Sequence, residues 1–257
     1  MDRKNKQIES SVEVALSIQQ AFLPSQGKLQ ELLKDYFIIY RPKDVVSGDF
    51  YWINKSGDRI MLIAADCTGH GVPGAFMTLI GTNLLDKIVR VWKVVNPGDI
   101  LSHLHQEILK VLRQKETNNH NGMDMVVLSL EKNAEETNII FSGAKNNLFY
   151  AIAGENTIEM LKGSRKSVGG IQNEEIDYEN QTLTLPSGSK IYTGSDGLED
   201  QNDKKRRRFG RKNLMSVLEN ISDKPMKEQK TLLEEALEIH MSATNQRDDI
   251  LWMGIQL

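Results

Sequence analysis

The chain has 257 residues, enough for one large domain or for one domain with an accessory segment. With 39% hydrophobic and 26% charged residues it has the composition of an ordinary soluble globular protein. A formal net charge of −3 excludes a general attraction to nucleic acid or anionic lipid, and the single cysteine, Cys67, excludes an internal disulfide framework.

The chain also lacks the signals of membrane insertion and secretion. No apolar run approaches the roughly 20 residues that a membrane span needs. The first residues, MDRKNKQIESS, are too polar for a secretory signal. We therefore expect a cytoplasmic protein without direct membrane insertion.

Residues 1–23 are predicted to form a helix, which Pro24 ends. Its apolar and large positions fall three and four apart: Ile8, Val12, Ala15, Gln19 and Phe22. A lone helix of this length is marginal in water and needs a partner surface. It either packs on its own domain or is the end of a signalling helix that forms a homodimer or joins a sensor domain. We assign residues 1–30 to this linker helix and residues 31–257 to the main domain.

The rest of the chain alternates between strand and helix patterns. Runs rich in β-formers predict strands at residues 37–40, 49–53, 60–65, 125–130, 137–141, 148–152, 182–185, 190–194 and 250–256. Helical periodicity predicts helices at residues 75–91, 97–112, 213–221 and 226–241. Many strands are joined by short turns and the helices come in consecutive pairs. This order indicates an α+β domain with antiparallel sheet and segregated helices.

Four aspartates stand at the ends of predicted strands. Asp49 opens one strand and Asp66 closes the next, Asp196 follows the strand at 190–194, and Asp248 precedes the last strand. An ionised carboxylate in such a place is costly unless it is paired or bound to a metal ion. A single one would be read as a cap or turn residue, but four of them indicate a shared site.

The spacing of the first two aspartates predicts that they share one face of a hairpin. If the strands pair around Ser56-Gly57, Asp49 lies opposite Ala64 and Asp66 lies diagonally across, about 7–8 Å away. Carboxylate clusters favour Mg²⁺ or Mn²⁺ over zinc. Two such ions about 3.5–4 Å apart can activate a water molecule and neutralise phosphoryl oxygens. The sequence therefore predicts a two-metal site for phosphoryl chemistry.

Seven segments, in order from about Tyr40 to the C-terminus, carry a family resemblance: YRPKDVVSGDFYW, IAADCTGHGVPGAFMTLIG, FSGAKNNLFY, SVGG, YTGSDGLEDQ, FGRKNL and QRDDILWMGI. With them the chain resembles the metal-dependent Ser/Thr protein phosphatase (PPM) superfamily, and within it the bacterial SpoIIE-type branch, named after stage II sporulation protein E. The resemblance implies a four-layer α-β-β-α sandwich of two antiparallel sheets flanked by helix pairs. It places a site for two Mn²⁺ or Mg²⁺ ions at one edge.

The same resemblance implies roles for individual residues. Asp66 matches the ligand that bridges both ions, and Cys67 matches the residue that binds one ion through its main-chain carbonyl. Asp49 would serve the first ion, and Asp196 and Asp248 the second. Asp249 fits a hydrogen bond at the start of the strand better than a metal ligand.

Two residues depart from the pattern of the eukaryotic relatives. Their proposed general-acid histidine is replaced by Thr68, and His70, two residues further on, either donates a proton or pins the loop. Arg41 is the nearest basic candidate for binding phosphate, or else a surface residue before Pro42.

The resulting hypothesis is a protein-serine/threonine phosphatase of bacterial partner switching. It would hydrolyse a phosphoprotein, of the anti-sigma-factor antagonist type, by metal-activated water. The alternative is a catalytically inactive binding module that keeps the fold and signals by docking. A third reading, a phosphohydrolase of small esters or nucleotides, has no P-loop or dinucleotide fingerprint to support it. The basic run at 204–208 is either a solvated loop or a docking surface, and we expect no nucleic-acid partner.

Overall fold

The computed structural model of the protein describes residues 2–170, 172 and 175–257. Its helices are α1 (Asp2–Phe22), α2 (Gln26–Leu32), α3 (Gly71–Leu85), the π-helical η1 (Asp86–Val91), α4 (Pro97–Val111), α5 (Gly197–Asp200), α6 (Gly210–Ile221) and α7 (Met226–Met241). Its strands are β1 (Asp35–Arg41), β2 (Asp49–Ser56), β3 (Arg59–Cys67), β4 (Gly122–Lys132), β5 (Glu136–Ala144), β6 (Leu148–Ala151), β7 (Glu159–Leu161), β8 (Val168–Gly169), β9 (Gln181–Pro186), β10 (Lys190–Gly194) and β11 (Ile250–Gln256).

The described strands form two antiparallel sheets. One has the order β1-β11-β10-β6-β7, and the other has the order β2-β3-β4-β5-β9, with β8 paired to β4. The first and last strands of the domain, β1 and β11, are neighbours. The C-terminal strand β11 therefore connects β1 to the rest of its sheet. The predicted α+β class is confirmed.

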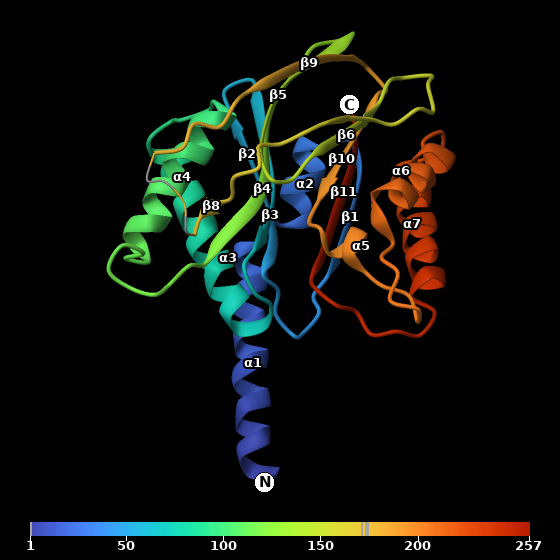
Figure 1. Ribbon diagram of the computed structural model, residues 1–257. Helices are drawn as coiled ribbons and strands as arrows, with labels where there is room; N and C mark the ends of the chain where they lie inside the picture. The colour runs from blue at the N-terminus through green and yellow to red at the C-terminus, as the bar shows by residue number, and fades with distance from the viewer. Residues whose placement is uncertain (1, 171, 173–174) are drawn as a thin grey trace.

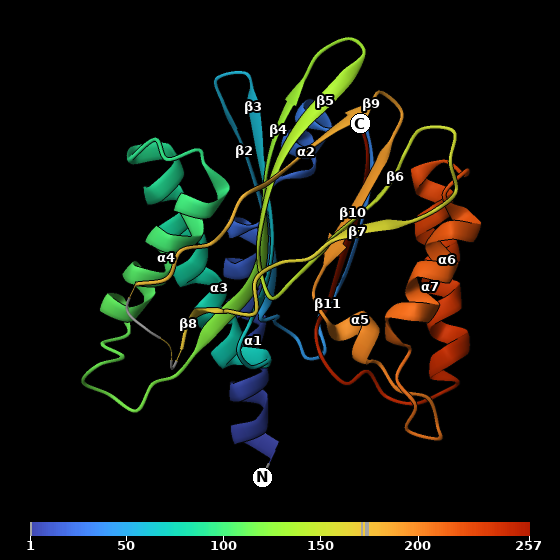
Figure 2. The ribbon, with the colours of Figure 1, turned by 45° about the horizontal axis from the view of Figure 1, so that its top comes forward.

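Helix pairs cover the outer faces of the two stacked sheets. Figures 1 and 2 show α3 and α4 on the outside of the β2–β5 sheet, and α6 and α7 on the outside of the β1-β11-β10 sheet. Three buried apolar clusters separate these layers: one between the sheets and one under each helix pair. The predicted four-layer α-β-β-α sandwich is confirmed.

Side-chain alternation along β3 connects two of these layers. Leu62 and Ala64 belong to the cluster between the sheets, whereas Met61, Ile63 and Ala65 belong to the cluster under α3 and α4. Successive residues of a strand point to opposite faces, so Asp66, which follows Ala65, faces the space between the sheets. The alternation of apolar residues along β3 thus determines the face of the sheet on which the Asp66 carboxylate lies.

The predicted register of the β2–β3 hairpin is wrong by two residues. The turn is formed by Gly57 and Asp58, because Ser56 pairs with Arg59, and Asp49 therefore lies opposite Asp66 rather than Ala64. Gly57 has a φ of 62°, which glycine adopts without the steric cost of a side chain. A shift of two residues keeps both aspartates on one face, so the predicted juxtaposition survives the error.

The predicted helix at 75–91 differs from the structure at both ends. The helix α3 starts at Gly71 and ends at Leu85, and the chain continues as the π-helix η1. Four short elements were not predicted: α2, α5, β7 and β8. Each is too short for its periodicity to stand out in the sequence.

The N-terminal helix α1 extends away from the sheets, as both ribbon views show, and only its C-terminal part reaches the body. Leu29 of α2 packs in the cluster between the sheets. The division of the chain at residues 30 and 31 falls inside α2 and stays a prediction. Among the described helices, none combines the length and the apolar character that crossing a membrane requires.

Candidate active site

Three aspartates lie side by side on neighbouring strands. Asp49 of β2 pairs with Asp66 of β3, and Asp66 pairs in turn with Asp124 of β4. Side chains directly opposite one another on one face of a sheet have Cβ atoms about 4.5–5.5 Å apart. Asp124 is followed at even spacing by Val126 and Leu128, which belong to the cluster between the sheets, so all three carboxylates face that space.

The opposite sheet contributes further carboxylates to the same edge. Asp196 stands two residues after the end of β10, and Asp248 stands two residues before the start of β11. These two strands are neighbours, so the end of one and the start of the other meet at one edge. Both aspartates are exposed, whereas Asp49 is only 2% exposed. The four predicted aspartates, together with Asp124, therefore converge at the mouth between the sheets.

Ser195 holds the buried Asp49 in place. Its Oγ donates a hydrogen bond to Asp49 Oδ2 at 2.6 Å and accepts one from the main-chain N–H of Leu251 at 3.0 Å. The hydroxyl thus links a carboxylate of one sheet to the backbone of the other. Sequence reasoning had passed over Ser195, which carries no charge of its own.

Asp249 organises the loop that leads to Asp49. Its carboxylate accepts hydrogen bonds from the main-chain N–H groups of Lys43 and Gly48, both at 2.7 Å. A Cβ on Gly48 would lie 2.4 Å from the carbonyl oxygen of Gly69, so the loops before β2 and after β3 pack backbone to backbone. Asp249 thus forms hydrogen bonds beside the start of β11, as expected, and its donors lie in the loop between β1 and β2.

Burial and mutual repulsion disfavour the ionised form of the clustered carboxylates. Burial raises the pKa of Asp49 and of Asp66 well above the usual range, and neighbouring carboxylates raise both further. The hydrogen bond from Ser195 opposes this shift in Asp49. The pKa of Asp196 is also raised, first by partial desolvation and then by the charges of Asp200 and Asp248. A nearby positive charge would stabilise the ionised form of such a cluster.

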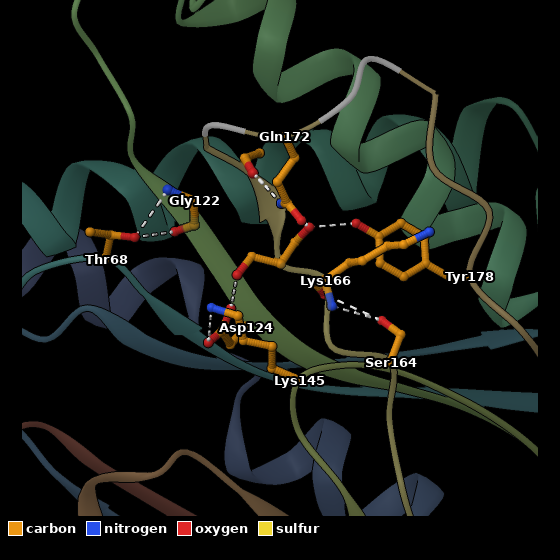
Figure 3. Close-up of polar contacts among 10 residues, drawn as sticks. Thr68, Gly122, Asp124, Lys145, Ser164, Lys166, Gln172 and Tyr178 are labelled. Carbon is orange, nitrogen blue, oxygen red and sulfur yellow. Dashed lines mark hydrogen bonds and ion pairs between the residues drawn. The ribbon is translucent and has the colours of Figure 1, made fainter.

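Lys145 is the cation nearest to this cluster. Its Nζ lies 3.4 Å from Asp124 Oδ2, and the ion pairs of the described residues give the five aspartates no other cationic partner. Figure 3 shows Lys145 and Asp124 together. The Ser167 hydroxyl also donates a hydrogen bond to Asp124 Oδ1, at 2.5 Å. Lys145 has a φ of 59°, a strained value for a residue with a side chain, and its N–H donates to the Ser164 carbonyl.

Asp124 and Lys145 were both missed by sequence reasoning, although Asp124 left a signal. It stands within the otherwise apolar strand sequence GMDMVVLSL, where a lone carboxylate is unusual. Asp124 lies within β4 and away from a glycine-rich turn after a strand, the setting of Asp66 and Asp196.

Cys67 presents its main chain, and not its thiol, to the site. The side chain is buried in the cluster under α3 and α4, on the face opposite to Asp66. Burial raises the pKa of the Cys67 thiol well above its usual value, so the group stays neutral and is a poor metal ligand. This orientation is compatible with the role of the Cys67 carbonyl oxygen as a metal ligand, which stays a prediction.

The two basic candidates have other partners. The guanidinium of Arg41 forms an ion pair at 2.6 Å with Glu238 of α7. His70 uses both ring nitrogens, with Nδ1 2.6 Å from Asp44 Oδ2 and Nε2 2.9 Å from Lys43 Nζ. These contacts pin the loop between β3 and α3, the second of the two roles open for His70. The predicted phosphate contact of Arg41 stays a prediction.

The donor set fits a hard divalent cation. Within the described residues, no three His, Cys, Asp or Glu side chains are spaced as ligands of a single ion. Mg²⁺ does not need such a cage, since it usually keeps several waters and takes one or two carboxylates. Carboxylate and carbonyl oxygens, with the one thiol turned away, suit Mg²⁺ or Mn²⁺ and disfavour zinc.

Comparisons with known proteins agree with this fold. The chain is 25% identical over 196 residues to the phosphoserine phosphatase RsbU of Bacillus subtilis (strain 168), covering 76% of this chain and 55% of that protein. The chain thus spans about half the length of this relative. The SiaA-PP2C domain of Pseudomonas aeruginosa superposes with a TM-score of 0.87 and 29% identity over the whole of both chains.

A second solved structure shares the fold at lower identity. It contains the PP2C phosphatase domain and a fragment of the regulatory domain of the cell fate determinant SpoIIE from Bacillus subtilis, with a TM-score of 0.65, 18% identity and coverage of 86% of this chain and 62% of that chain. The family model for stage II sporulation protein E matches residues 56–257, a range that includes Asp66, Asp124, Asp196 and Asp248 and begins just after Asp49. Because this match covers far more than half of its length, the chain belongs to the stage II sporulation protein E (SpoIIE) family.

Proposed function

We propose that the chain is a metal-dependent protein-serine/threonine phosphatase that hydrolyses a phosphoprotein. The observation that carries this proposal is the convergence of Asp49, Asp66, Asp124, Asp196 and Asp248 from both sheets at one edge of the sandwich. Family membership and the named phosphatase relatives support it. An inactive binding module would have no use for buried carboxylates that repel one another.

Two Mn²⁺ or Mg²⁺ ions are proposed to occupy this edge. Asp66 would contact both, Asp49 and the carbonyl of Cys67 would serve the first, and Asp196 and Asp248 would serve the second. When bound, such ions supply Lewis acidity, lowering the pKa of water and neutralising phosphoryl oxygens during in-line displacement. Hydrolysis would then need no covalent phosphoenzyme.

The chain's own residues position these groups. Ser195 orients Asp49 through its hydroxyl, and Asp249 holds the preceding loop by two main-chain hydrogen bonds. Lys145, already beside Asp124, is the cation best placed to bind an oxygen of the substrate phosphate. We propose Lys145 for this role ahead of Arg41, which is held by Glu238.

The substrate and partners follow from the relatives. A phosphoserine phosphatase relative supports a phosphoserine or phosphothreonine protein as substrate, and we propose a small cytoplasmic protein of the anti-sigma-factor antagonist type. The exposed apolar side chains Ile8, Val14 and Ile18 of α1 support a link through this helix to a second copy or to a sensor domain. Nucleic acid is not a proposed partner, given the net charge of −3.

The decisive experiment measures turnover of para-nitrophenyl phosphate with and without Mn²⁺. Wild-type protein should be active only with the metal. Loss of a residue that merely supports a metal ligand commonly costs about 10–100-fold, so Asp66→Ala, which removes a proposed ligand, should cost more than about 100-fold. Asp58→Ala, an exposed aspartate in the turn of the same hairpin, is the matched control and should keep full activity.

The alternatives give different outcomes. A folded wild-type protein that turns over no phosphate ester with Mn²⁺ or Mg²⁺ would establish the binding module instead. Faster turnover of nucleotides or free phosphoserine than of a phosphoprotein would indicate a phosphohydrolase of small molecules.

A further inference from the structure

The basic run of the sequence forms a hairpin between α5 and α6. Asn202 and Arg208 pair as an isolated antiparallel bridge, and the N–H of Arg206 donates to the carbonyl of Asp203 at 2.9 Å, which closes the turn. Figures 1 and 2 show this segment, the basic hairpin (residues 202–208), projecting beside α5. The phosphatase chemistry described above gives the basic hairpin no role.

The basic hairpin is held in place at its turn and at its base. The Asp203 carboxylate, 11% exposed, accepts hydrogen bonds from the main-chain N–H groups of Lys205 at 2.8 Å and Arg207 at 2.9 Å. Nε2 of His240, on α7, lies 3.1 Å from the carbonyl oxygen of Arg207. Phe209, which follows the hairpin, is buried and packs edge-on against the His240 ring, 5.2 Å away between centroids. The cations of the run are therefore presented on a defined turn.

Three adjacent cations of the basic hairpin have no counter-charge. Arg207 pairs with Asp203 at 2.7 Å, and Arg208 pairs with Asp200 at 2.8 Å. The other cations of the run are exposed and form no ion pair within the part of the chain that the structure describes: Lys204, Lys205 and Arg206. Like charges held together on one turn repel one another, and a carboxylate supplied from outside would relieve that repulsion.

The backbone at Arg206 also indicates a binding surface. Its φ of 61° lies in the left-handed region, which disfavours residues with a side chain other than asparagine or aspartate. Residues held in such conformations are frequent at ligand-binding positions. An arginine here presents a planar guanidinium, which can donate two parallel hydrogen bonds to one carboxylate.

The basic hairpin borders the active site. Arg208, at the base of the hairpin, lines the same cavity as Asp124 and Asp196. Arg206 is two residues from Arg208, and two residues of extended chain span at most about 7 Å. The unpaired cations are therefore close enough to meet side chains that flank a phosphoserine bound at the aspartates.

The size of this surface favours an acidic peptide over nucleic acid. Nucleic-acid-binding domains are usually basic overall and spread lysine and arginine over a whole face or along a helix. In this protein the unpaired cations of the run stand on one tight turn of a chain with a net charge of −3. A few carboxylates on one peptide segment match a surface of that size.

We propose that the basic hairpin docks acidic side chains next to the phosphorylated residue of the protein substrate, through Lys204, Lys205 and Arg206. The proposal rests on the proposed phosphatase function and adds a substrate preference to it, namely for phosphoserines in acidic segments. The phosphoryl group lies at the aspartates, and the flanking carboxylates lie on the hairpin.

The kinetic test compares two peptides with one phosphoserine each, flanked by glutamates in one and by alanines in the other. With Mn²⁺, the wild-type protein should show a kcat/KM about tenfold higher for the acidic peptide, since each exposed ion pair contributes a factor of about two. In the variant that combines Lys204→Gln, Lys205→Gln and Arg206→Asn, this ratio should fall to about one. Asparagine tolerates the left-handed conformation, so the turn is kept.

A matched control removes the same charge elsewhere, by combining Lys55→Gln, Lys93→Asn and Lys227→Gln. All three lysines are exposed, and Lys93 has a φ of 62°, close to that of Arg206. Lys55 stands near the opposite end of β2 from Asp49, and Lys227 near the opposite end of α7 from the hairpin contact. The control should keep the wild-type ratio, which separates the hairpin from the net charge of the protein.

Charge reversal gives a gain rather than a loss. The variant with Lys204→Glu and Lys205→Glu should turn over a lysine-flanked phosphoserine peptide faster than the glutamate-flanked one. Raising NaCl from about 50 to about 500 mM should lower the wild-type ratio, because salt screens exposed charges. The same change should leave the ratio of the glutamine and asparagine variant unaltered.

The outcomes separate the docking proposal from the phosphatase function. Wild-type protein that turns over neither peptide overturns the phosphatase function. Turnover of both peptides with a ratio near one, or an equal fall of the ratio in the hairpin variant and the control, overturns the docking alone. Tighter binding of single-stranded oligodeoxythymidine than of the acidic peptide, measured by fluorescence anisotropy and lost in the hairpin variant, would overturn the peptide as the partner.

Discussion

Ser195 shows how one uncharged residue can set the geometry of a charged site. It donates to Asp49 at 2.6 Å and is itself fixed by the N–H of Leu251. Without the hydroxyl, Asp49 would keep its buried place but lose its orientation. The serine also offsets part of the rise in the pKa of Asp49 that burial causes.

We therefore expect Ser195→Ala to weaken metal binding rather than abolish it. Losses of residues that orient metal ligands commonly cost about 10–100-fold in metal affinity or activity. The measurement is the Mn²⁺ concentration that gives half-maximal turnover of para-nitrophenyl phosphate, which should rise. Ser142→Ala is the control, because Ser142 is equally buried and donates to the carbonyl of Glu179. Equal Mn²⁺ requirements in the two variants would contradict a role for Ser195 at the site.

The sequence predicted the charged residues at strand ends better than their neighbours. Asp49, Asp66, Asp196 and Asp248 were found because a carboxylate after an apolar strand demands an explanation. Ser195 raised no such question, since a serine beside glycine is ordinary in a turn. Its role depends on a hydrogen bond across 146 residues of chain, which no local pattern contains.

At the scale of elements, the β2–β3 hairpin shows what a sequence leaves open. The strands and their facing were predicted, but the turn was centred on Ser56-Gly57 instead of Gly57-Asp58. Moving the centre of a hairpin turn by one residue changes every pairing by two. A shift of two residues keeps each side chain on the same face of the sheet, but it changes the distance between side chains on the two strands. The change from α3 to η1 at Asp86 was equally unforeseen, because a single π-helical turn leaves the apolar pattern almost unaltered.

The helix α1 is tied to the active site by one buried side chain. Gln19, 2% exposed, donates through Nε2 to the carbonyl of Ser47 at 2.6 Å and accepts from the N–H of Ser47 at 3.0 Å. Ser47 Oγ accepts in turn from the N–H of Asp49, and Thr78 of α3 donates to the Ser47 carbonyl. A displacement of α1 would therefore move Ser47 and, through it, the backbone at Asp49.

Gln19→Ala should destabilise the loop before Asp49. The Ser47 carbonyl would keep the hydrogen bond from Thr78, but the Ser47 N–H would lose its acceptor, and leaving a buried polar group unsatisfied costs about 1–3 kcal/mol. Chemical denaturation should report that loss of stability, and the Mn²⁺ requirement should rise. Gln20→Ala, at the exposed neighbouring position of the same helix, should match wild type in both measurements. If the two variants behave alike, α1 is not coupled to the site.

At the scale of the whole molecule, the site exists because two sheets end at one edge. Asp49, Asp66 and Asp124 belong to one sheet, while Asp196 and Asp248 flank neighbouring strands of the other. Stacking the sheets brings the two sets together, so the folded state must confine several like charges. The sequence predicted this convergence through the family resemblance, and strand patterns alone left the pairing of the sheets undetermined.

The gathering of these aspartates at one edge predicts how the free energy of unfolding depends on pH and on bound metal. The raised pKa values of Asp49, Asp66 and Asp196 mean that the folded protein without metal binds more protons than the unfolded chain above about pH 4. The free energy of unfolding should therefore fall as pH rises through the folded-state pKa values. Glu107 has a lowered pKa, so its contribution is lost only on acidification and leaves the range from pH 5 to 8 undisturbed.

Mn²⁺ should reverse that loss, because it binds the deprotonated carboxylates of the folded state and competes with their protons. At 100 times its dissociation constant the metal would add about 2.7 kcal/mol to the free energy of unfolding. Thermal denaturation from pH 5 to 8, with EDTA or with Mn²⁺, should show a gap in Tm that widens with pH. Asp66→Asn removes one of the confined charges, so it should raise the Tm in EDTA at pH 8 and shrink the gap, whereas Asp58→Asn at the exposed turn should do neither. A Tm in EDTA that increases from pH 5 to 8, or an equal response of both variants to Mn²⁺, would show that the carboxylates do not share one site.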